Sequence, residues 1–383
     1  MKKILLLKDK EGASAEEFYQ ILLRYSKNKK ISCVLYHVKD LKMEEVVTSS
    51  VVICIRGDTP YMRYFISKAK SMGKFVIYFL DDALKNMPDN SFRYPGRRKW
   101  HLECVKLCDV LLTTNQFIAE DYRQYVKNQR YALINTAVNR LTKNYTKGNH
   151  QRVKIVYAAS EWHIDNYNKM IAPIIDKLLE QYKDKIELYF VGFRPELKKS
   201  NIVHFVPKMG LADYQSYMEN AGFDIGLAPL EDSYFSKRKY FNKFIEYTRY
   251  GICGIYSDVY PYKFVVRNAE NGYLVKNCPE KWLSSIQYVI DQDKKRIECI
   301  TNAQDYLIKN HSDSVIFSKL EEDIPEITYD IKFLNEHFSD RQRLCKILMY
   351  YPFLIRERLY MVRFSIKNEG LKITAKRIRT KLS

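Results

Sequence analysis

The sequence predicts an α/β protein with two tandem Rossmann-like domains, and three observations support this. The chain has 383 residues, which is longer than a single hydrophobic core usually supports. Short apolar runs alternate with helix-like stretches, as in βαβ units on a parallel sheet. The alternation stops at a polar stretch over residues 140–152 and then restarts, which divides the chain into two similar halves joined by a linker.

The first predicted domain covers residues 1–140. Its expected strands are Lys3–Leu7, Ser32–Val38, Val51–Ile55, Phe75–Leu80, Asp109–Thr113 and Ala132–Asn135. Amphipathic stretches between them predict helices over Ala15–Ser26, Tyr61–Met72, Arg98–Leu107 and Gln116–Val126. Such an order is typical of an open, doubly wound sheet.

The second predicted domain covers residues 153–310. Its expected strands are Lys154–Ala158, Glu187–Val191, His204–Val206, Asp224–Ala228, Cys253–Tyr256 and Gly272–Val275. Helices are expected over Asn166–Gln181, Ala212–Ala221 and Lys239–Tyr250, and after Pro279 over Glu280–Asp291 and Lys294–Asn310. Residues 311–383 are expected to form a third, helical and basic segment.

Composition and the start of the chain bear on location. Hydrophobic residues make up 46% and charged residues 28% of the chain, which is typical of a globular protein. Only four apolar residues, Ile4–Leu7, stand together near the start, whereas a secretory signal needs roughly 7–15. No stretch reaches the ~18 apolar residues of a membrane-spanning helix. We therefore expect a cytoplasmic protein.

Eight cysteines are scattered without paired spacing or nearby histidines. Neither a zinc site nor a disulfide framework is therefore indicated. Cys104 and Cys108 share a predicted helix, where buried small side chains are the simpler interpretation.

The net charge of +19 is concentrated at the end of the chain. Residues 341–383 hold 12 Lys/Arg against Glu357 and Glu369, a local balance of +10. Bulky apolar residues interleave with these charges at helix-like spacing, which is typical of a helix lying on an anionic membrane. A helical cap that buries the same apolar residues on the enzyme is the alternative. Nucleic acid is not an expected partner, because no recognition motif is visible.

Neither domain carries the G-x-G-x-x-G fingerprint of a dinucleotide site after its first strand. The second domain instead has a strand ending at Pro229, a polar loop, and a helix with Asn242, Lys243 and Glu246. Lys243 and Glu246 share a helix face. Helix amides and a lysine suit a nucleotide diphosphate, and a carboxylate suits ribose hydroxyls. An ordinary salt bridge on a surface helix is the alternative.

These segments resemble family-4-type (glycosyltransferase group 1) enzymes of bacterial surface polysaccharide biosynthesis. The matching residues are Ala228-Pro229-Leu230, the Lys243–Gly251 segment in the pattern K-x-x-E-Y-x-x-x-G, and Ser257-Asp258, followed by Glu270–Val275 and Trp282. In the first domain Arg56, Asp81-Asp82 and the Gly12–Ser14 loop also fit. The resemblance covers about residues 1–310 and implies the GT-B fold, in which a cleft lies between two Rossmann-like domains.

The resemblance implies a retaining glycosyltransferase that moves a sugar from a nucleotide-sugar to a glycan or lipid-linked acceptor. Residues 1–140 would form the acceptor side, with Ser14 and Arg56. The expected donor-binding residues are Ser160, His163, Asp165, Pro229, Asn242, Lys243 and Glu246. Asp81, Asp82 and Lys243 are the expected catalytic residues, with one aspartate accepting the acceptor proton. Helix N-capping is the alternative for the aspartates.

Two positions depart from the family pattern. Arg238 stands where many such enzymes have the first glutamate of a pair, and Ser160–Asp165 stands where they have an arginine–lysine phosphate pair. No Asp-x-Asp motif adjoins the donor residues, so we expect no metal and no cofactor besides the donor substrate. A nucleotide-sugar epimerase of GT-B fold and a non-catalytic sugar- or nucleotide-binding assembly protein are the alternative functions. We also expect peripheral attachment to the inner membrane face through residues 341–383.

Overall fold

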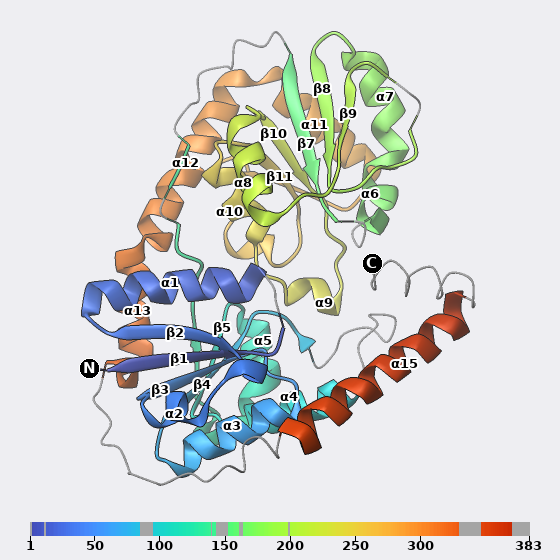
Figure 1. Cartoon of the computed structure of the whole chain (residues 1–383). Coiled ribbons are helices and arrows are strands. Elements are labelled where there is room, and N and C mark those ends of the chain that lie inside the picture. The colour runs from blue at the N-terminus through green and yellow to red at the C-terminus, as the bar shows by residue number, and fades with distance from the viewer. Residues whose placement is uncertain are drawn as a thin grey trace. The chain divides into compact units, whose positions relative to one another are not determined.

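The computed structural model describes residues 2–10, 13–84, 95–138, 140–142, 152–160, 164–197, 200–328 and 346–369. The chain divides into two compact units (Figure 1). Unit 1 is Met1–Thr136 together with Phe317–Ser383, and unit 2 is Ala137–Ile316. The chain therefore returns to unit 1 after completing unit 2.

Unit 1 contains a six-stranded parallel sheet in the order β2-β1-β3-β4-β5-β6. Its strands are β1 (Lys3–Lys8), β2 (Ser32–His37), β3 (Val51–Ile55), β4 (Phe75–Leu80), β5 (Val110–Thr113) and β6 (Tyr131–Leu133). Its helices are α1 (Ala13–Lys29), α2 (Met43–Val47), α3 (Pro60–Ser71), α4 (Pro95–Val105), α5 (Gln116–Tyr122) and, late in the chain, α15 (Tyr351–Glu369). The short α2 was not predicted.

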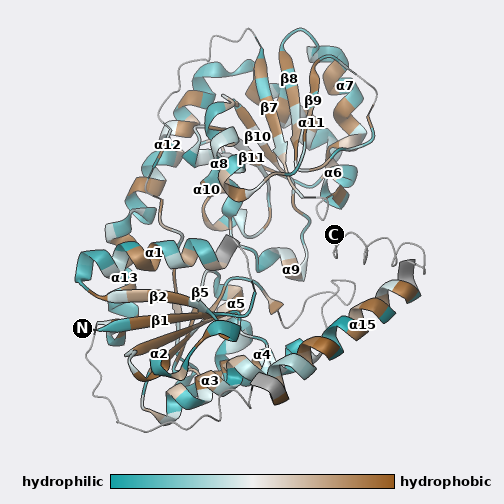
Figure 2. Ribbon diagram, viewed as in Figure 1, coloured by the Kyte–Doolittle hydropathy of each residue, from teal (hydrophilic) through white to brown (hydrophobic). Residues whose placement is uncertain are grey.

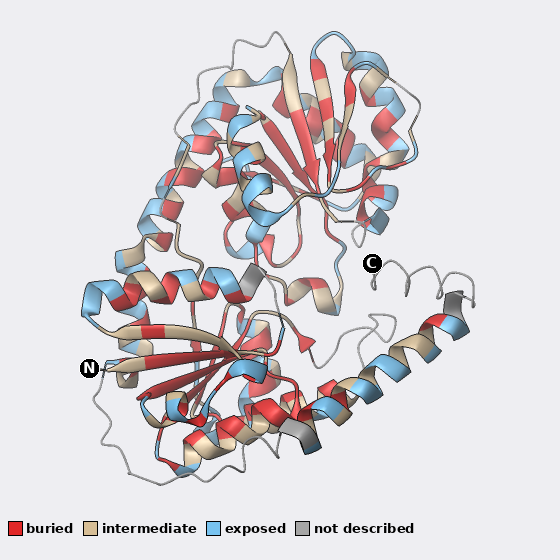
Figure 3. Ribbon diagram, viewed as in Figure 1, coloured by how far each residue is buried: buried red, intermediate tan, exposed pale blue. Residues whose placement is uncertain are grey.

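Helices cover both faces of this sheet, so its strands read as continuous apolar runs. Tyr78 of β4 belongs to the core formed with α3 and α4, while its neighbour Phe79 stacks on Phe18 of α1 with ring centroids 3.9 Å apart. Helix α13 (Asp313–Asp323) adds to the α1 side, where Tyr25 donates a hydrogen bond to Glu321. Figure 3 shows the central strands buried.

Unit 2 contains a second six-stranded parallel sheet in the order β12-β11-β10-β7-β8-β9. Its strands are β7 (Val153–Ala158), β8 (Ile186–Val191), β9 (Val203–Val206), β10 (Ile225–Ala228), β11 (Cys253–Ser257) and β12 (Tyr273–Val275). Its helices are α6 (Ile164–Met170), α7 (Ala172–Tyr182), α8 (Leu211–Asn220), α9 (Tyr234–Lys237), α10 (Asn242–Arg249), α11 (Pro279–Asp291) and α12 (Asp293–His311).

Two helix predictions in unit 2 were wrong in detail. The single helix expected over Asn166–Gln181 is split into α6 and α7, because Pro173 lacks an amide hydrogen and its ring would clash with the preceding turn. The helix expected from Lys239 begins at Asn242, after the separate short helix α9.

The predicted stop of α10 at Gly251 is confirmed. Gly251 has a φ of +71°. Its amide donates to the Thr248 carbonyl, and the Ile252 amide donates to the Tyr247 carbonyl, which is the Schellman arrangement. The described cysteines are free, and six of the seven are buried. No helix in the described part of the chain is both long and apolar enough to span a membrane.

We predict that Gly251→Ala lowers the free energy of unfolding by about 1 kcal/mol, because a Cβ is disfavoured in the left-handed region. Gly251→Asn is the comparison and should lose less, because asparagine adopts the left-handed region more readily than alanine. Urea denaturation of both variants checks this. Equal stabilities would contradict the assigned cap.

Candidate functional site

Each sheet has one topological switch point, where successive strands stop being added on one side of the first strand and continue on its other side. In unit 1 this point lies between β1 and β3, and in unit 2 between β7 and β10. Ligands of open α/β sheets bind at the carboxyl ends of the strands beside such a point. The two strand-end edges, considered separately, are therefore the candidate sites.

In unit 2 the edge is built from small residues and a fixed loop. β7 ends at Ala158, and Gly192 after β8 has a φ of +91°; a Cβ there would lie 2.5 Å from the Ala159 carbonyl oxygen. The loop after β10 is held because the Leu230 amide donates to Ser257 Oγ at 2.8 Å. The Glu231 amide donates to Asn166 Oδ1 at 3.0 Å.

Lys243, Glu246 and Tyr214 form a polar cluster on α10 and α8, named here the α10 cluster. Lys243 Nζ lies 2.8 Å from Glu246 Oε1, and Tyr214 Oη donates to the same oxygen at 2.5 Å. Lys243 also donates to Tyr214 Oη at 3.2 Å. Burial, then the Glu246 charge, raise the pKa of Tyr214 well above its usual range, so Tyr214 stays protonated and keeps donating.

Close packing fixes α10 against the sheet. Tyr247 Oη donates to the Leu227 carbonyl at 2.9 Å. A Cβ on Gly226 would lie 2.5 Å from the Tyr247 ring, so glycine is required at this approach. The α10 cluster is therefore carried by a helix with little freedom to shift along β10.

Four other predicted donor residues lie at strand ends and helix starts of unit 2. Pro229 is buried at the end of β10, and Ser160 is half-buried after β7. Asn242 is exposed at the start of α10, and Asp165 is exposed in the first turn of α6. His163 lies outside the described residues.

Arg238, the departure from the family pattern, is buried. Its guanidinium donates to the Tyr234 carbonyl at 2.9 Å and lies 3.2 Å from the centroid of the Tyr234 ring. The side chain therefore packs within the α9 turn.

In unit 1 Arg56, predicted on the acceptor side, meets the predicted catalytic residues Asp81 and Asp82 at the ends of β3 and β4. Arg56 forms ion pairs with Asp81 and, at 3.0 Å, with Asp82. Arg56 has a φ of +48°, an uncommon conformation for a residue with a side chain, and its amide donates to the Phe79 carbonyl. Both aspartates thus pair with Arg56. Residues 85–94, where a helix capped by them would be tested, lie outside the described residues. The Ser14 side chain also lies outside the description.

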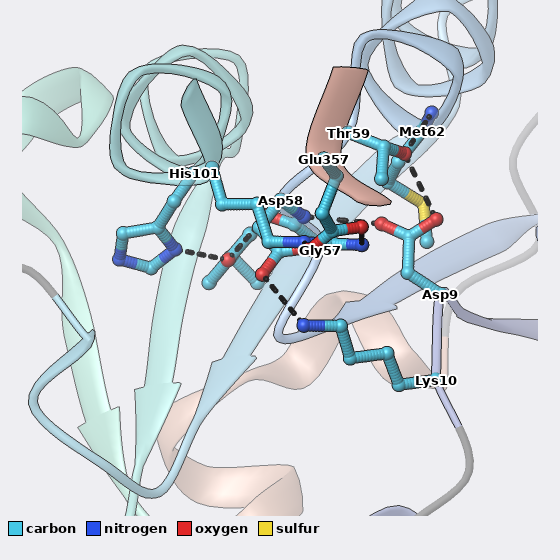
Figure 4. Close-up of polar contacts among 10 residues, drawn as sticks. Asp9, Lys10, Gly57, Asp58, Thr59, Met62, His101 and Glu357 are labelled. Carbon is cyan, nitrogen blue, oxygen red and sulfur yellow. Dashed lines mark hydrogen bonds and ion pairs between the residues drawn. The ribbon is translucent and has the colours of Figure 1, made fainter. Parts of the chain in front are cut away.

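A second polar cluster at this edge was not predicted. Asp9, directly after β1, accepts hydrogen bonds from the Asp58 amide at 3.0 Å and from Thr59 Oγ1 at 2.9 Å (Figure 4). Thr59 is the N-cap of α3. The Asp9 carboxylate therefore accepts one amide and one hydroxyl hydrogen from the two residues that precede α3.

Arg97 of α4 links this cluster to the C-terminal helix. Its guanidinium forms ion pairs with Asp58 and with Glu357 of α15. The Arg97 and Asp58 side chains are 4% and 1% exposed, so the pair is held away from water. Lys10 Nζ lies 3.8 Å from Asp58 Oδ2. Three carboxylates thus meet two cations.

His101 and Tyr78 extend the cluster below the sheet edge. Tyr78 Oη donates to the Gly57 carbonyl at 2.8 Å and lies 2.5 Å from His101 Nδ1. Because Tyr78 has one proton, Nδ1 of His101 is the donor in their contact. The sequence signal for the cluster was Asp9 and Asp58, each following a strand, but nothing local pairs them with Arg97 or Glu357.

No group of three metal-ligating side chains suited to an ion occurs among the residues that the structure describes.

Comparison with solved structures places the fold. Anabaena HepE in complex with UDP and glucose has a TM-score of 0.61 at 12% identity, covering 85% of this chain and 100% of that chain. The lipopolysaccharide outer core galactosyltransferase WaaB has a TM-score of 0.58 at 14% identity, covering 85% and 99%. A putative UDP-N-acetylglucosamine 2-epimerase from Listeria monocytogenes has 0.55 at 11%, covering 86% and 98%.

No family model and no curated protein sequence matches the chain. The structural likeness confirms the predicted GT-B fold with two Rossmann-like domains. At these identities it establishes the fold and leaves the activity to be argued from the site.

We predict that Asp9→Asn raises the free energy of unfolding at pH 8 by on the order of 1–2 kcal/mol and changes it little at pH 4. Burial, then the Asp58 charge, raise the pKa of Asp9 to about 7. The folded chain therefore binds more protons than the unfolded chain between about pH 4 and 7, and this contribution to stability is lost as pH rises. Asparagine keeps one of the two acceptor oxygens and carries no charge. Urea unfolding across pH checks this; parallel wild-type and variant profiles would contradict it.

Proposed function

We propose that the chain is a glycosyltransferase that uses a nucleotide-sugar donor and binds the nucleotide on unit 2. The α10 cluster carries this proposal. Lys243 lies in the first turn of α10, where the helix dipole and the unpaired backbone amides of a helix start favour an anion. Phosphate binding uses these same two features. The solved structure of HepE that holds UDP and glucose supports the choice of donor.

The roles of the donor-side residues follow from the charge that develops on the leaving group. The leaving nucleoside diphosphate gains negative charge in the transition state, so a cation already in place lowers the barrier. Lys243 fills this role. Both described contacts of Glu246 fall on Oε1, so Oε2 suits a ribose hydroxyl. Ser160, Asp165, Asn242 and the loop at Pro229 complete the donor side of the proposal, together with His163.

Asp81 and Asp82 are proposed for the acceptor side. Their ion pairs with Arg56 orient both carboxylates, and a carboxylate can accept the proton of an attacking hydroxyl. Ser14 and Arg56 would line the approach of the acceptor. Retention at the anomeric carbon belongs to the proposal through the family resemblance.

The proposed acceptor is a glycan or a lipid-linked glycan of surface polysaccharide assembly. WaaB, a galactosyltransferase of the lipopolysaccharide outer core, is one of the structures with this fold. The protein would work in the cytoplasm, on the inner membrane face, with residues 341–383 as the contact. Nucleic acid is not a proposed partner.

A nucleotide-sugar epimerase is the second candidate, favoured by the epimerase among the similar structures. Arg238 in place of a glutamate favours the third, a binding protein without catalysis. Purified protein incubated with UDP-sugars separates the three by NMR. Release of free sugar and UDP supports the transferase, a new UDP-sugar supports the epimerase, and binding without change supports the non-catalytic protein.

We predict that Lys243→Ala weakens UDP binding by about 1.5–3 kcal/mol, the cost of a charge-assisted hydrogen bond. Tyr214 still donates to Glu246 in this variant, so the fold should persist. Lys177→Ala, at an exposed lysine of α7, is the charge-matched control. Isothermal calorimetry measures both; unchanged affinity in the Lys243 variant would place the donor elsewhere.

We predict that turnover persists in excess EDTA, because lysine and helix amides would neutralise the phosphates. Sugar release from the UDP-sugar is measured with EDTA, with manganese, and with neither. Loss of turnover in EDTA that manganese restores would sink the metal-independent mechanism.

A further inference from the structure

Helix α15 has two faces with different surroundings. Its inner face packs on unit 1: Phe353 is buried, Leu354 packs against the core, and Glu357 pairs with Arg97. Tyr350, just before the helix, is buried and lies 5.4 Å from the Tyr61 ring of α3. The Arg97 guanidinium lies 5.4 Å from the Phe353 ring. The helix is therefore attached to α3 and α4 by apolar and ionic contacts.

An apolar row follows the opposite face. It consists of residues three, four or seven apart, a spacing that keeps them on one side of a helix. Its members on α15 and their exposed fractions are Tyr351 48%, Ile355 58%, Leu359 56% and Ile366 36%. Leu348, 64% exposed, extends the row from the π-helical turn Lys346–Tyr350 that precedes α15. We call these residues the outer row. Large apolar side chains that are exposed side by side mark an interaction surface. Figure 2 shows hydrophobic residues recurring along α15, and Figure 3 shows its exposure.

Basic residues flank the outer row. Arg356, Arg358, Arg363 and Lys367 are all exposed. The helix has two acidic residues, Glu357 and Glu369, and Glu357 is turned inward onto Arg97. Pairing Glu357 on the inner face removes its charge from the outer face, which is then dominated by cations. Beyond the helix, residues 370–383 add five more Lys/Arg and no acidic residue.

We propose that the outer row of α15 docks unit 1 on an anionic lipid membrane. Apolar side chains in a line insert at the boundary between headgroups and acyl chains, and the flanking arginines contact the negative headgroups. Inner and outer faces are used at the same time, so docking requires no unfolding of the helix. The inference rests on the membrane contact of the proposed transferase and assigns it to one face of α15.

The Arg97–Glu357 pair gives the docking a direction. Because α15 is joined to α4, and Arg97 joins α4 to Asp58 at the strand-end edge, the membrane-facing row is linked through two ion pairs to the edge that carries the proposed acceptor residues. A lipid-linked acceptor would thus be presented from the surface on which unit 1 rests.

The test is flotation of the full chain with vesicles of phosphatidylcholine alone or mixed equally with phosphatidylglycerol. We expect wild type to float with the anionic vesicles at low salt and less at high salt. Ile355→Gln with Leu359→Gln should bind about tenfold more weakly, because two inserted side chains are lost. The control is Ile297→Gln with Ile308→Gln, at exposed isoleucines of α12, which should bind as wild type does.

A second pair of variants separates charge from insertion. Arg356→Gln with Arg358→Gln should lose most of the salt-dependent part of the binding and keep the same melting temperature. Wild-type flotation by the Ile355/Leu359 variant would overturn the proposal. The proposal would also be overturned if the outer row joined two copies of the chain. In that case sedimentation would show a wild-type dimer, the Ile355/Leu359 variant would be a monomer, and neither protein would float.

UDP affinity measured on the same preparations keeps the two proposals distinct. Flotation without UDP binding would overturn the proposed function alone, and UDP binding without flotation would overturn the membrane docking alone.

Discussion

Both sheets are parallel and covered by helices on both faces, and this constraint decides where chemistry can occur. A strand such as β3, Val51–Ile55, is buried along its whole length, so it can hold no exposed functional group. Polar side chains collect where the strands end, and the points at which the strand order reverses leave a space there. Asp9, Arg56 and Asp81 in unit 1 follow from this, as do Ser160 and Pro229 in unit 2.

The two strand-end edges differ in electrostatics, and the difference favours unit 2 for the donor. In unit 1 the loop before α3 already holds the Asp9 carboxylate, with Asp58 close enough to raise the pKa of Asp9. A phosphate brought there would meet two carboxylates and would have to displace one. In unit 2 no acidic side chain caps the start of α10, and Lys243 lies in its first turn. This difference supports the proposal that the nucleotide phosphates bind at the second edge.

Local patterns predicted the sheets well because strands buried on both faces leave an unmistakable signature. The expected ranges for β3 and β4, Val51–Ile55 and Phe75–Leu80, coincide with the observed strands. The stop of α10 was predictable because Gly251 reports a backbone conformation rather than a distant contact. Pro173 marks the break between α6 and α7 in the sequence. The apolar periodicity continues across Pro173, however, and it predicted a single helix.

The buried cluster of unit 1 could not be predicted from local patterns. Asp9 and Asp58 are 49 residues apart, and Arg97 and Glu357 are 260 apart. Their meeting depends on the chain returning to unit 1 after the whole of unit 2, which no periodicity encodes. The Lys243–Glu246 pair was predictable because it lies within one turn of a helix, whereas Tyr214 reaches it from α8 and was missed. Whether these residues bind donor stays a prediction.

The C-terminal segment was open to two interpretations, a cap on the enzyme or a membrane helix, and α15 removes the conflict between them. A helix presents side chains all round, so a sequence with apolar residues at two sets of positions can bury one set and expose the other. Phe353 and Glu357 hold the inner face, and Ile355 and Leu359, two residues along from each, point to the other side. The ion pair with Arg97 has a cost, because both charges lose water. Its effect is to fix which face of α15 is turned outward, and that choice leaves the basic residues and the exposed apolar row together on one surface.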